Sequence, residues 1–135
     1  MKTKEEILDF LEKNNCNQEL INDVKKVYGY YKIGLSYKEN GVKFTKLALK
    51  QDKARNGQDV YNIALSYKYF GVEFTELALQ HEKAKDGDDV YYIAKSYKQN
   101  GAEFTELALQ QKQAKRGWDV YQTACKKWME CLLKQ

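Results

Sequence analysis

The sequence predicts an all-α protein, and more specifically an α-solenoid of antiparallel helix pairs. Three consecutive segments of 30 residues, 29–58, 59–88 and 89–118, align without gaps, and the second and third are identical at 20 of 30 positions. Six of the eight glycines recur at two fixed phases of this repeat, and the chain contains no proline. This scarcity of turn-forming residues favours helices over a β fold. Since stacked repeats bury one continuous core, we expect a single domain over 1–135 with about nine helices.

Residues 1–28 differ from the repeats, and we expect them to form an N-terminal cap of two helices. The spacing of apolar residues predicts these helices over 4–13 and 18–28, with asparagines between them. A solenoid needs such a cap because its terminal face would otherwise expose apolar surface to water.

The first helix of each repeat is predicted from its apolar face. In the second repeat this face has the spacing i, i+3, i+4 and i+7, at Val60, Ile63, Ala64 and Tyr67. Asp59 precedes the face and is the expected N-cap. Gly71 follows it and is expected to end the helix with a left-handed backbone, a conformation that glycine adopts at the lowest cost.

The second helix of each repeat has its own predicted start and end. Thr75 is the expected N-cap, with Phe74 before it and Leu79 four residues inside the helix, the spacing of a hydrophobic staple. Gly87 is expected to end this helix in the same way as Gly71 ends the first. The other repeats carry the same four residue types at the equivalent positions.

Residues 119–135 begin a fourth unit but complete only half of it, and we expect a closing helix that acts as a C-terminal cap. Its broad apolar face contains Val120, Ala124, Trp128, Cys131 and Leu132. We expect this face to seal the last repeat. The alternatives are that it forms a homodimer surface or that a partner docks on it.

Four segments of the second repeat carry a resemblance to a known family. They read Tyr-x-Ile-Ala-x-x-Tyr at 61–67, then Gly71-Val72, Leu77-Ala78-Leu79 and Lys83-Ala84-x-x-Gly87-Asp88. These segments resemble the Sel-one-like repeat, a relative of the tetratricopeptide repeat, and the resemblance covers 29–118 and the half unit to 135. The unit of 30 residues is shorter than is usual in either family. The resemblance implies a scaffold without chemistry of its own, which binds proteins or peptides on the concave face formed by the first helices.

The resemblance also places tyrosines and lysines on that concave face. The expected partner-binding residues are Tyr31, Lys38, Tyr61, Leu65, Lys68, Tyr91, Lys95, Lys98 and Trp128. Tyrosine offers rigid contact area with a hydroxyl and lysine offers charge, so this face suits an extended peptide with acidic groups. The alternative is that the tyrosines pack between repeats and the lysines remain solvated. Specificity is expected at positions that differ between repeats, among them Tyr69, Phe70 and Trp118.

Nucleic acid is a rival class of partner, because aromatic and lysine side chains on a helical repeat also track a phosphate backbone. A groove that follows such a backbone is expected to be basic along its whole length. Seven basic and two acidic side chains give 29–58 a charge of +5, whereas 59–88 has −3 and 89–118 has +2. This uneven charge favours a protein partner. A self-assembling structural protein is the third class.

We identify no catalytic, metal or cofactor site in the sequence and expect a protein that is not an enzyme. His81 stands where the other repeats have glutamine, and Cys16, Cys125 and Cys131 lack the spacing of metal ligands. The odd number of cysteines and a charged N-terminal segment without an export signal predict reduced thiols and a cytoplasmic protein. No apolar run approaches the roughly 20 residues of a membrane span, so we expect no membrane contact.

Overall fold

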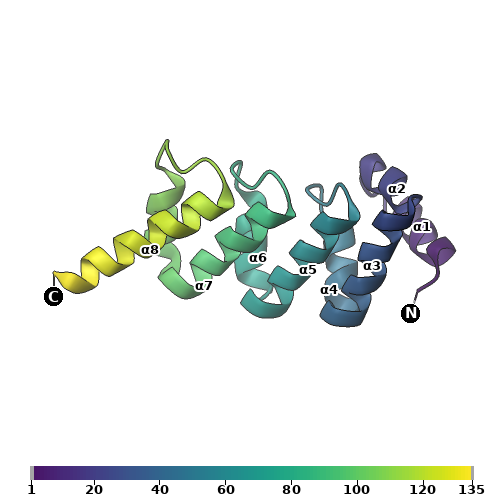
Figure 1. Cartoon of the computed structure of the whole chain (residues 1–135), viewed down its shortest axis with the longest axis horizontal. Helices are drawn as coiled ribbons and strands as arrows, with labels where there is room; N and C mark the ends of the chain where they lie inside the picture. The colour runs from purple at the N-terminus through teal and green to yellow at the C-terminus, as the bar shows by residue number, and fades with distance from the viewer. Residues whose placement is uncertain (1, 135) are drawn as a thin grey trace.

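The computed structural model describes residues 2–134, and all regular secondary structure in this range is helical. The prediction of an all-α protein is therefore confirmed. The eight helices in this range are α1 (Lys4–Lys13), α2 (Gln18–Val24), α3 (Val27–Asn40), α4 (Val42–Leu49), α5 (Gly57–Phe70), α6 (Val72–Gln80), α7 (Gly87–Leu109) and α8 (Gly117–Leu133). They follow one another along the long axis of the molecule, with the two termini at opposite ends (Figure 1).

The helices of the repeats form two layers. In the first layer α3, α5, α7 and α8 lie side by side in chain order, each packed on the next (Figure 1). In the second layer α4 packs on α3 and α5, and α6 packs on α5 and α7. The second helix of a repeat therefore also contacts the first helix of the following repeat.

Helix α7 spans two of the helices that the sequence predicts. It contains one non-helical residue, Gly101, with φ 86° and ψ 164°. Gly41 and Gly71 have nearly the same backbone angles, and they separate α3 from α4 and α5 from α6. The predicted positive φ at these glycines is confirmed, but their ψ angles place them outside the left-handed helical region that was expected. A residue with a side chain is strained at such angles, which explains the glycine.

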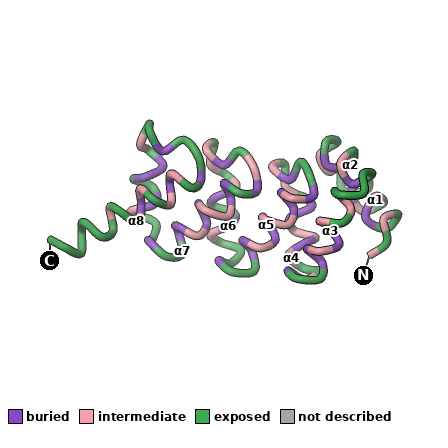
Figure 2. Tube along the Cα trace, viewed as in Figure 1, coloured by how far each residue is buried: buried purple, intermediate pink, exposed green. Residues whose placement is uncertain are grey.

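The predicted apolar face of the first helices is buried. Val60, Ile63, Ala64 and Tyr67 of α5 are each at most 1% exposed. The equivalent α7 residues are Val90, Ile93, Ala94 and Tyr97, and they are buried as well. Burying one such aliphatic or aromatic side chain contributes about 1.5–3 kcal/mol. Buried stretches recur in each helix pair, whereas the C-terminal part of α8 is exposed (Figure 2).

The predicted threonine N-caps are wrong. Helix α6 begins at Val72, directly after the turn at Gly71, so Thr75 lies inside the helix and its N–H donates to the Gly71 carbonyl at 3.2 Å. Its buried hydroxyl forms a hydrogen bond of 2.7 Å with the hydroxyl of Ser66 on α5. The same bond joins Ser36 to Thr45 and Ser96 to Thr105. These threonines therefore hold the two helices of a repeat together, and no hydrophobic staple forms around them.

The second set of glycines does not end the second helices, contrary to the prediction. Gly57, Gly87 and Gly117 are the first residues of α5, α7 and α8, after loops that follow α4, α6 and α7. Their role is to permit close packing, since a Cβ on Gly87 would lie 2.6 Å from the backbone oxygen of Asp59. Asp59 itself is not the N-cap of α5, because Asn56 takes that place.

Asp59 instead connects two repeats. Its carboxylate accepts hydrogen bonds from the N–H of Arg55 at 3.2 Å and from the N–H of Gly87 in the next repeat at 3.0 Å. Asp89 accepts from the N–H of Gly117 at 2.9 Å in the same way. A buried carboxylate that receives the first amide of the next helix fixes the distance between consecutive first helices.

Both ends of the chain depart from the prediction in part. The helix expected over 18–28 is divided, because α2 ends at Val24 and α3 begins at Val27. Only the first half of α8 packs on the last repeat, since its buried residues are Gly117, Val120 and Ala124. The expectation that Trp128, Cys131 and Leu132 help to seal the repeat is wrong, and all three are exposed. The physical reason is that α8 extends past the helices on which it packs (Figure 1).

Candidate binding surface

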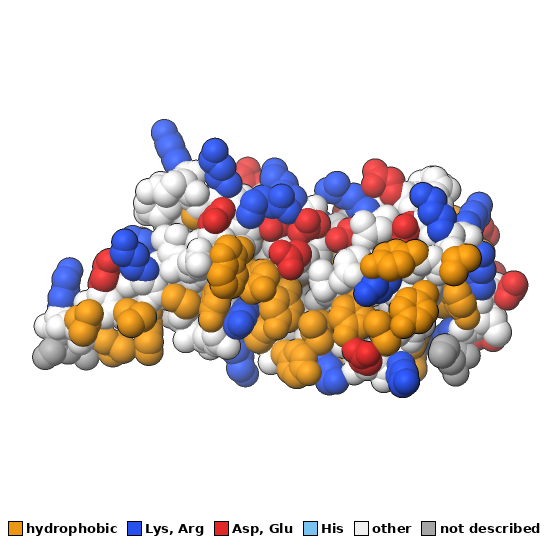
Figure 3. Space-filling view, in the orientation of Figure 1, with side chains coloured by type: hydrophobic (Ala, Val, Ile, Leu, Met, Phe, Trp, Pro, Cys, Tyr) orange, Lys and Arg blue, Asp and Glu red, His pale blue; other side chains and the backbone are white. Residues whose placement is uncertain are grey.

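Aromatic side chains from the four helices of the first layer lie along one face, and we call this set the aromatic band. Hydrophobic side chains follow one another along this face of the molecule (Figure 3). The band consists of Tyr28, Tyr31, Tyr61, Tyr69, Phe70, Tyr91, Tyr92, Trp118 and Tyr121. Three of the predicted partner-binding residues, Tyr31, Tyr61 and Tyr91, belong to it.

The C-terminal half of the band is a chain of touching rings. Consecutive ring centroids lie 5.0–6.5 Å apart along the series Tyr69, Phe70, Tyr91, Tyr92, Trp118 and Tyr121. Edge-to-face and tilted pairs at these distances are mutually favourable. Tyr69 is 57% exposed and Trp118 is 47% exposed, so the cluster presents apolar surface to a partner. Three of its members, Tyr69, Phe70 and Trp118, were predicted as positions of specificity.

Lys95 supplies the positive charge of this half. Its Nζ atom lies 4.8 Å from the ring centroid of Tyr121 and 5.9 Å from that of Tyr92. A lysine over aromatic faces is held by cation–π attraction, worth about 0.5–1 kcal/mol at an exposed site. Lys95 stands where the other two repeats have leucine, so the charge is particular to the third repeat.

The N-terminal half of the band combines separated tyrosines with lysines. Tyr31 is 60% exposed, and with Leu35 and Lys38 it lines a groove of about 380 Å³. Lys32 lies 5.6 Å from the ring centroid of Tyr28 and 5.7 Å from that of Tyr61. This half is therefore basic and open, in contrast to the packed rings at the other end.

Tyr61 and Lys68 have a second role in packing. The Tyr61 hydroxyl donates a hydrogen bond to the Glu39 carboxylate, and Lys68 Nζ donates to the Glu39 carbonyl oxygen at 2.6 Å. The hydrogen bond to Glu39, followed by burial, raises the pKa of Tyr61 to about 12. Tyr121 repeats the pattern, since its hydroxyl donates to Gln99 at 2.8 Å. The alternative that tyrosines connect neighbouring units therefore holds for these hydroxyls, while the rings still lie on the band.

The remaining predicted residues are spread along the same layer. Leu65 and Tyr91 are half-buried, with the ring of Tyr91 against Phe70 at 5.0 Å, and Lys98 is exposed. Trp128 is 41% exposed and lies on the part of α8 that extends beyond the repeats.

Sequence reasoning missed Tyr28 and Lys32 as members of this surface and noted Tyr92 only as variable. Lys32 and Tyr92 occupy one repeat position, directly after the predicted tyrosines Tyr31 and Tyr91. The residue that directly follows Tyr31 or Tyr91 in the sequence was therefore the signal that could have identified Lys32 and Tyr92.

The groups that were considered for chemistry have structural surroundings. His81 Nδ1 accepts a hydrogen bond from the N–H of Lys83 at 3.1 Å, and burial lowers the pKa of the imidazole. All three cysteines are free thiols, and burial raises the pKa of Cys16. Between residues 2 and 134, no three His, Cys, Asp or Glu side chains gather where they would hold a metal ion. In the same range, none of the helices combines the length and apolar character that crossing a membrane requires.

Comparisons of the chain with known protein families, with curated proteins and with solved structures find no match.

Proposed function

We propose that the protein is an α-solenoid of short helix pairs, of the tetratricopeptide-like or Sel-one-like kind, with caps at 1–28 and 119–135. The repeated contacts support this assignment. The serine–threonine bond, the glycine turn and the aspartate–glycine bond each recur at intervals of 30 residues. Lys53 and Lys83 extend the pattern to the loops, donating to the carbonyls of His81 and Gln111 at 2.6 and 2.7 Å. Such nearest-neighbour contacts are the basis of solenoid stability.

We further propose that the protein is a non-catalytic scaffold that binds a protein or peptide along the aromatic band. The observation that carries this proposal is the exposure of large aromatic rings on one layer, those of Tyr28, Tyr31, Tyr69 and Trp118. Contiguous apolar surface of this kind is costly in water and marks interaction sites. Tyrosine and tryptophan are also the residues that most often dominate binding energy.

The two halves of the band favour a partner with two kinds of segment. Lys32 and Lys38 lie along the N-terminal half and Lys68 lies at its border, over the ring of Tyr69, so this part of the band suits acidic residues. The packed rings of the C-terminal half suit apolar side chains. The partner that fits best is therefore an extended peptide with acidic residues at one end and apolar residues at the other.

The proposal is tested by selecting peptides on the full-length protein from a display library and measuring their affinity for matched variants. Tyr31→Ala and Trp118→Ala remove exposed rings of the band and are each expected to weaken binding by about 1–2 kcal/mol, or roughly five- to thirtyfold. Leu77→Ala is the matched control, because Leu77 is 36% exposed on α6, in the second layer. Equal affinity of all variants, with unchanged circular dichroism spectra, would exclude the band as the binding surface.

Two alternatives are separated by further measurements. A nucleic-acid ligand requires an affinity for single-stranded oligonucleotides that falls steeply with salt, whereas a protein partner survives nuclease treatment. A self-assembling protein that uses the exposed end of α8 requires a mass that rises with concentration in light scattering. A constant monomer mass excludes the self-assembling protein.

A further inference from the structure

Tyr37 differs from its equivalents in the other repeats by lacking a stacked aromatic neighbour. Tyr67 and Tyr97 each carry a phenylalanine ring from the preceding repeat. The Phe44 centroid lies 6.2 Å from that of Tyr67 with an angle of 5° between the rings, and Phe74 lies 6.1 Å from Tyr97 with an angle of 4°. A parallel phenylalanine ring on this tyrosine is therefore a shared feature of the second and third repeats.

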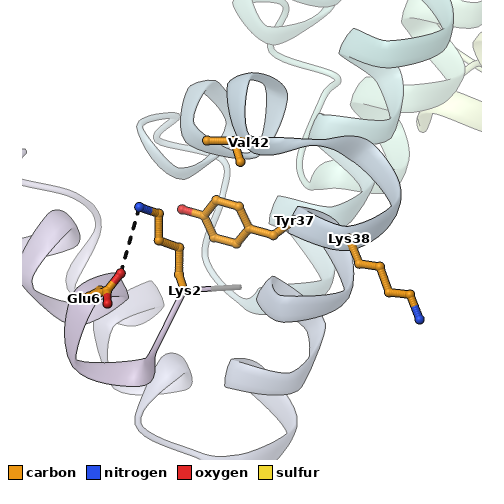
Figure 4. A pocket seen from close by; sticks show the side chains of 5 residues that line it. All are labelled: Lys2, Glu6, Tyr37, Lys38 and Val42. Atoms are coloured by element: carbon orange, nitrogen blue, oxygen red, sulfur yellow. Dashed lines mark ion pairs between the residues drawn. The ribbon is translucent and has the colours of Figure 1, made fainter.

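The first repeat has no preceding phenylalanine, and Lys2, Glu6 and Phe10 lie around Tyr37 instead, so that its side chain is 8% exposed and borders two cavities. The residue 30 positions before Phe44 is Asn14, at the end of α1. Within residues 2–134 no aromatic ring stacks on Tyr37, which lines a cavity of about 410 Å³ together with Lys2, Glu6, Lys38 and Val42. The Tyr37 ring extends between Lys2 and Val42, while Lys38 is directed away (Figure 4). A cavity of this volume is within the range of small-ligand sites.

A second cavity adjoins the first across Tyr37. It has a volume of about 260 Å³, shares Lys2, Glu6 and Tyr37 with the first, and reaches Phe10 and Lys46. Together the linings of the two cavities include Val42 and Lys46 of α4, with Tyr37 common to both.

The charge around these cavities also departs from the repeat pattern. Lys46 stands where the later repeats have Glu76 and Glu106. Lys2 pairs with Glu6 at 3.9 Å, and the Lys13 and Asp9 side chains pair at 2.9 Å. Lys46 forms no ion pair with any residue of 2–134, so it is the ammonium group left for an anion.

We propose that the cavity between α1, α3 and α4 binds an aromatic ring that bears a carboxylate, with the ring on Tyr37 and the carboxylate at Lys46. The ring stacks on Tyr37 as Phe44 and Phe74 stack on the following tyrosines, and because Tyr37 is only 8% exposed it has to displace the Lys2 side chain to do so. Two sources share this chemistry, a free aromatic acid and a peptide whose C-terminal residue is aromatic. The site lies at the N-terminal end and uses side chains of α3 and α4 with residues of the N-terminal segment, and its binding of an aromatic acid does not depend on the proposed function.

The test is a residue-resolved NMR titration of the full-length protein with phenylpropionate. The expected result is saturable shifts centred on Tyr37, Val42 and Lys46. Cyclohexylpropionate keeps the charge but lacks the aromatic ring, and phenylpropionamide keeps the ring but lacks the charge, so each is expected to bind about fivefold more weakly. Equal binding of all three compounds, or shifts confined to other regions, would overturn the proposal.

Variants that carry the residues found at the equivalent positions of the later repeats are expected to keep the fold intact in this test. Lys46→Glu introduces the residue found in the later repeats and is expected to weaken phenylpropionate binding at least about fivefold. Lys43→Glu is the matched control with the same change of charge on α4, since the later repeats have Glu73 and Glu103 there. Equal weakening by both variants would show a non-specific effect of charge and contradict the site.

Filling the cavity and changing the source of the carboxylate complete the experiment. Val42 is 50% exposed, so Val42→Trp is tolerated and is expected to abolish binding by occupying the larger cavity. Unchanged binding to this variant would overturn the placement of the ring.

Tighter binding of an acetylated tripeptide ending in phenylalanine than of phenylpropionate supports the site with a peptide terminus as its ligand. The reverse order supports it with a free aromatic acid.

Discussion

The substitution Gly87→Ala tests how closely consecutive repeats are packed. An added Cβ would lie 2.6 Å from the Asp59 backbone oxygen and 2.7 Å from the Asp59 Cα, both shorter than real Cβ contacts allow. Because both atoms belong to the backbone, α7 has to move away from α5 to relieve the overlap. Overpacking of this kind costs about 1–3 kcal/mol.

The same movement weakens a hydrogen bond. The Gly87 N–H donates to the buried Asp59 carboxylate at 3.0 Å, and hydrogen bonds to charged groups contribute about 1.5–3 kcal/mol. The two effects share one displacement and are not additive, so we expect a loss of about 2–4 kcal/mol in the free energy of unfolding. This is a large fraction of the roughly 5–15 kcal/mol that stabilises a typical domain.

Urea unfolding followed by circular dichroism measures this loss. Gly34→Ala is the matched control, because Gly34 lies within α3 and the later repeats have Ala64 and Ala94 at its position. The control is expected to be neutral or slightly stabilising, since alanine has the higher helix propensity. An unfolding free energy of Gly87→Ala within about 0.5 kcal/mol of wild type would refute the reasoning from close approach.

Three further predictions follow from hydrogen bonds and burial. Thr75→Val keeps the shape of the side chain but leaves the buried Ser66 hydroxyl without its partner, and we expect a loss of about 1–3 kcal/mol by urea unfolding; a neutral result would contradict a stabilising role of this hydrogen bond. Glu39→Gln removes the charge that accepts the Tyr61 hydroxyl, so the pKa of Tyr61 is expected to fall from about 12 toward 10.0, measured by NMR of the labelled ring carbon; an unchanged pKa would contradict the assigned cause. Burial raises the pKa of Asp59 above 3.8, so its contribution to stability is present at lower pH and is lost as the pH rises through the raised value. Unfolding at about pH 3 and about pH 6 should therefore show wild type losing stability relative to Asp59→Asn, and a difference that is independent of pH would exclude this linkage.

The two proposals, for the aromatic band and for the Tyr37 cavity, depend on different aromatic rings. The band uses exposed rings of α3, α5 and α8 with half-buried rings of α7, and substitutions of these rings leave Tyr37 and Lys46 in place. The cavity is lined by Lys46 and Val42 of α4, which carries no ring of the band, so changes at these two residues leave the band unaltered. The two proposals therefore succeed or fail independently.

The sequence by itself determined the helical class, the repeat length and the buried face of the first helices. Val60, Ile63, Ala64 and Tyr67 follow the period of a helix, and that period depends only on local backbone geometry. The positive φ of Gly41, Gly71 and Gly101 was equally predictable, because glycine is the residue that tolerates it.

Only the tertiary structure decided the roles of the threonine and of the second glycine that recur in each repeat. Thr75 is a good N-cap by its type, yet its hydroxyl bonds Ser66 because the turn at Gly71 starts the helix three residues earlier. Gly87 suits a helix end by its type, yet it lies at the start of α7, where the Asp59 backbone approaches too closely for a side chain. In both cases the deciding contact lies on another helix, so local propensity carries no information about it. The lack of a stacked ring on Tyr37 within residues 2–134 is likewise a matter of tertiary contacts, since Tyr67 and Tyr97 receive their phenylalanine rings from another helix.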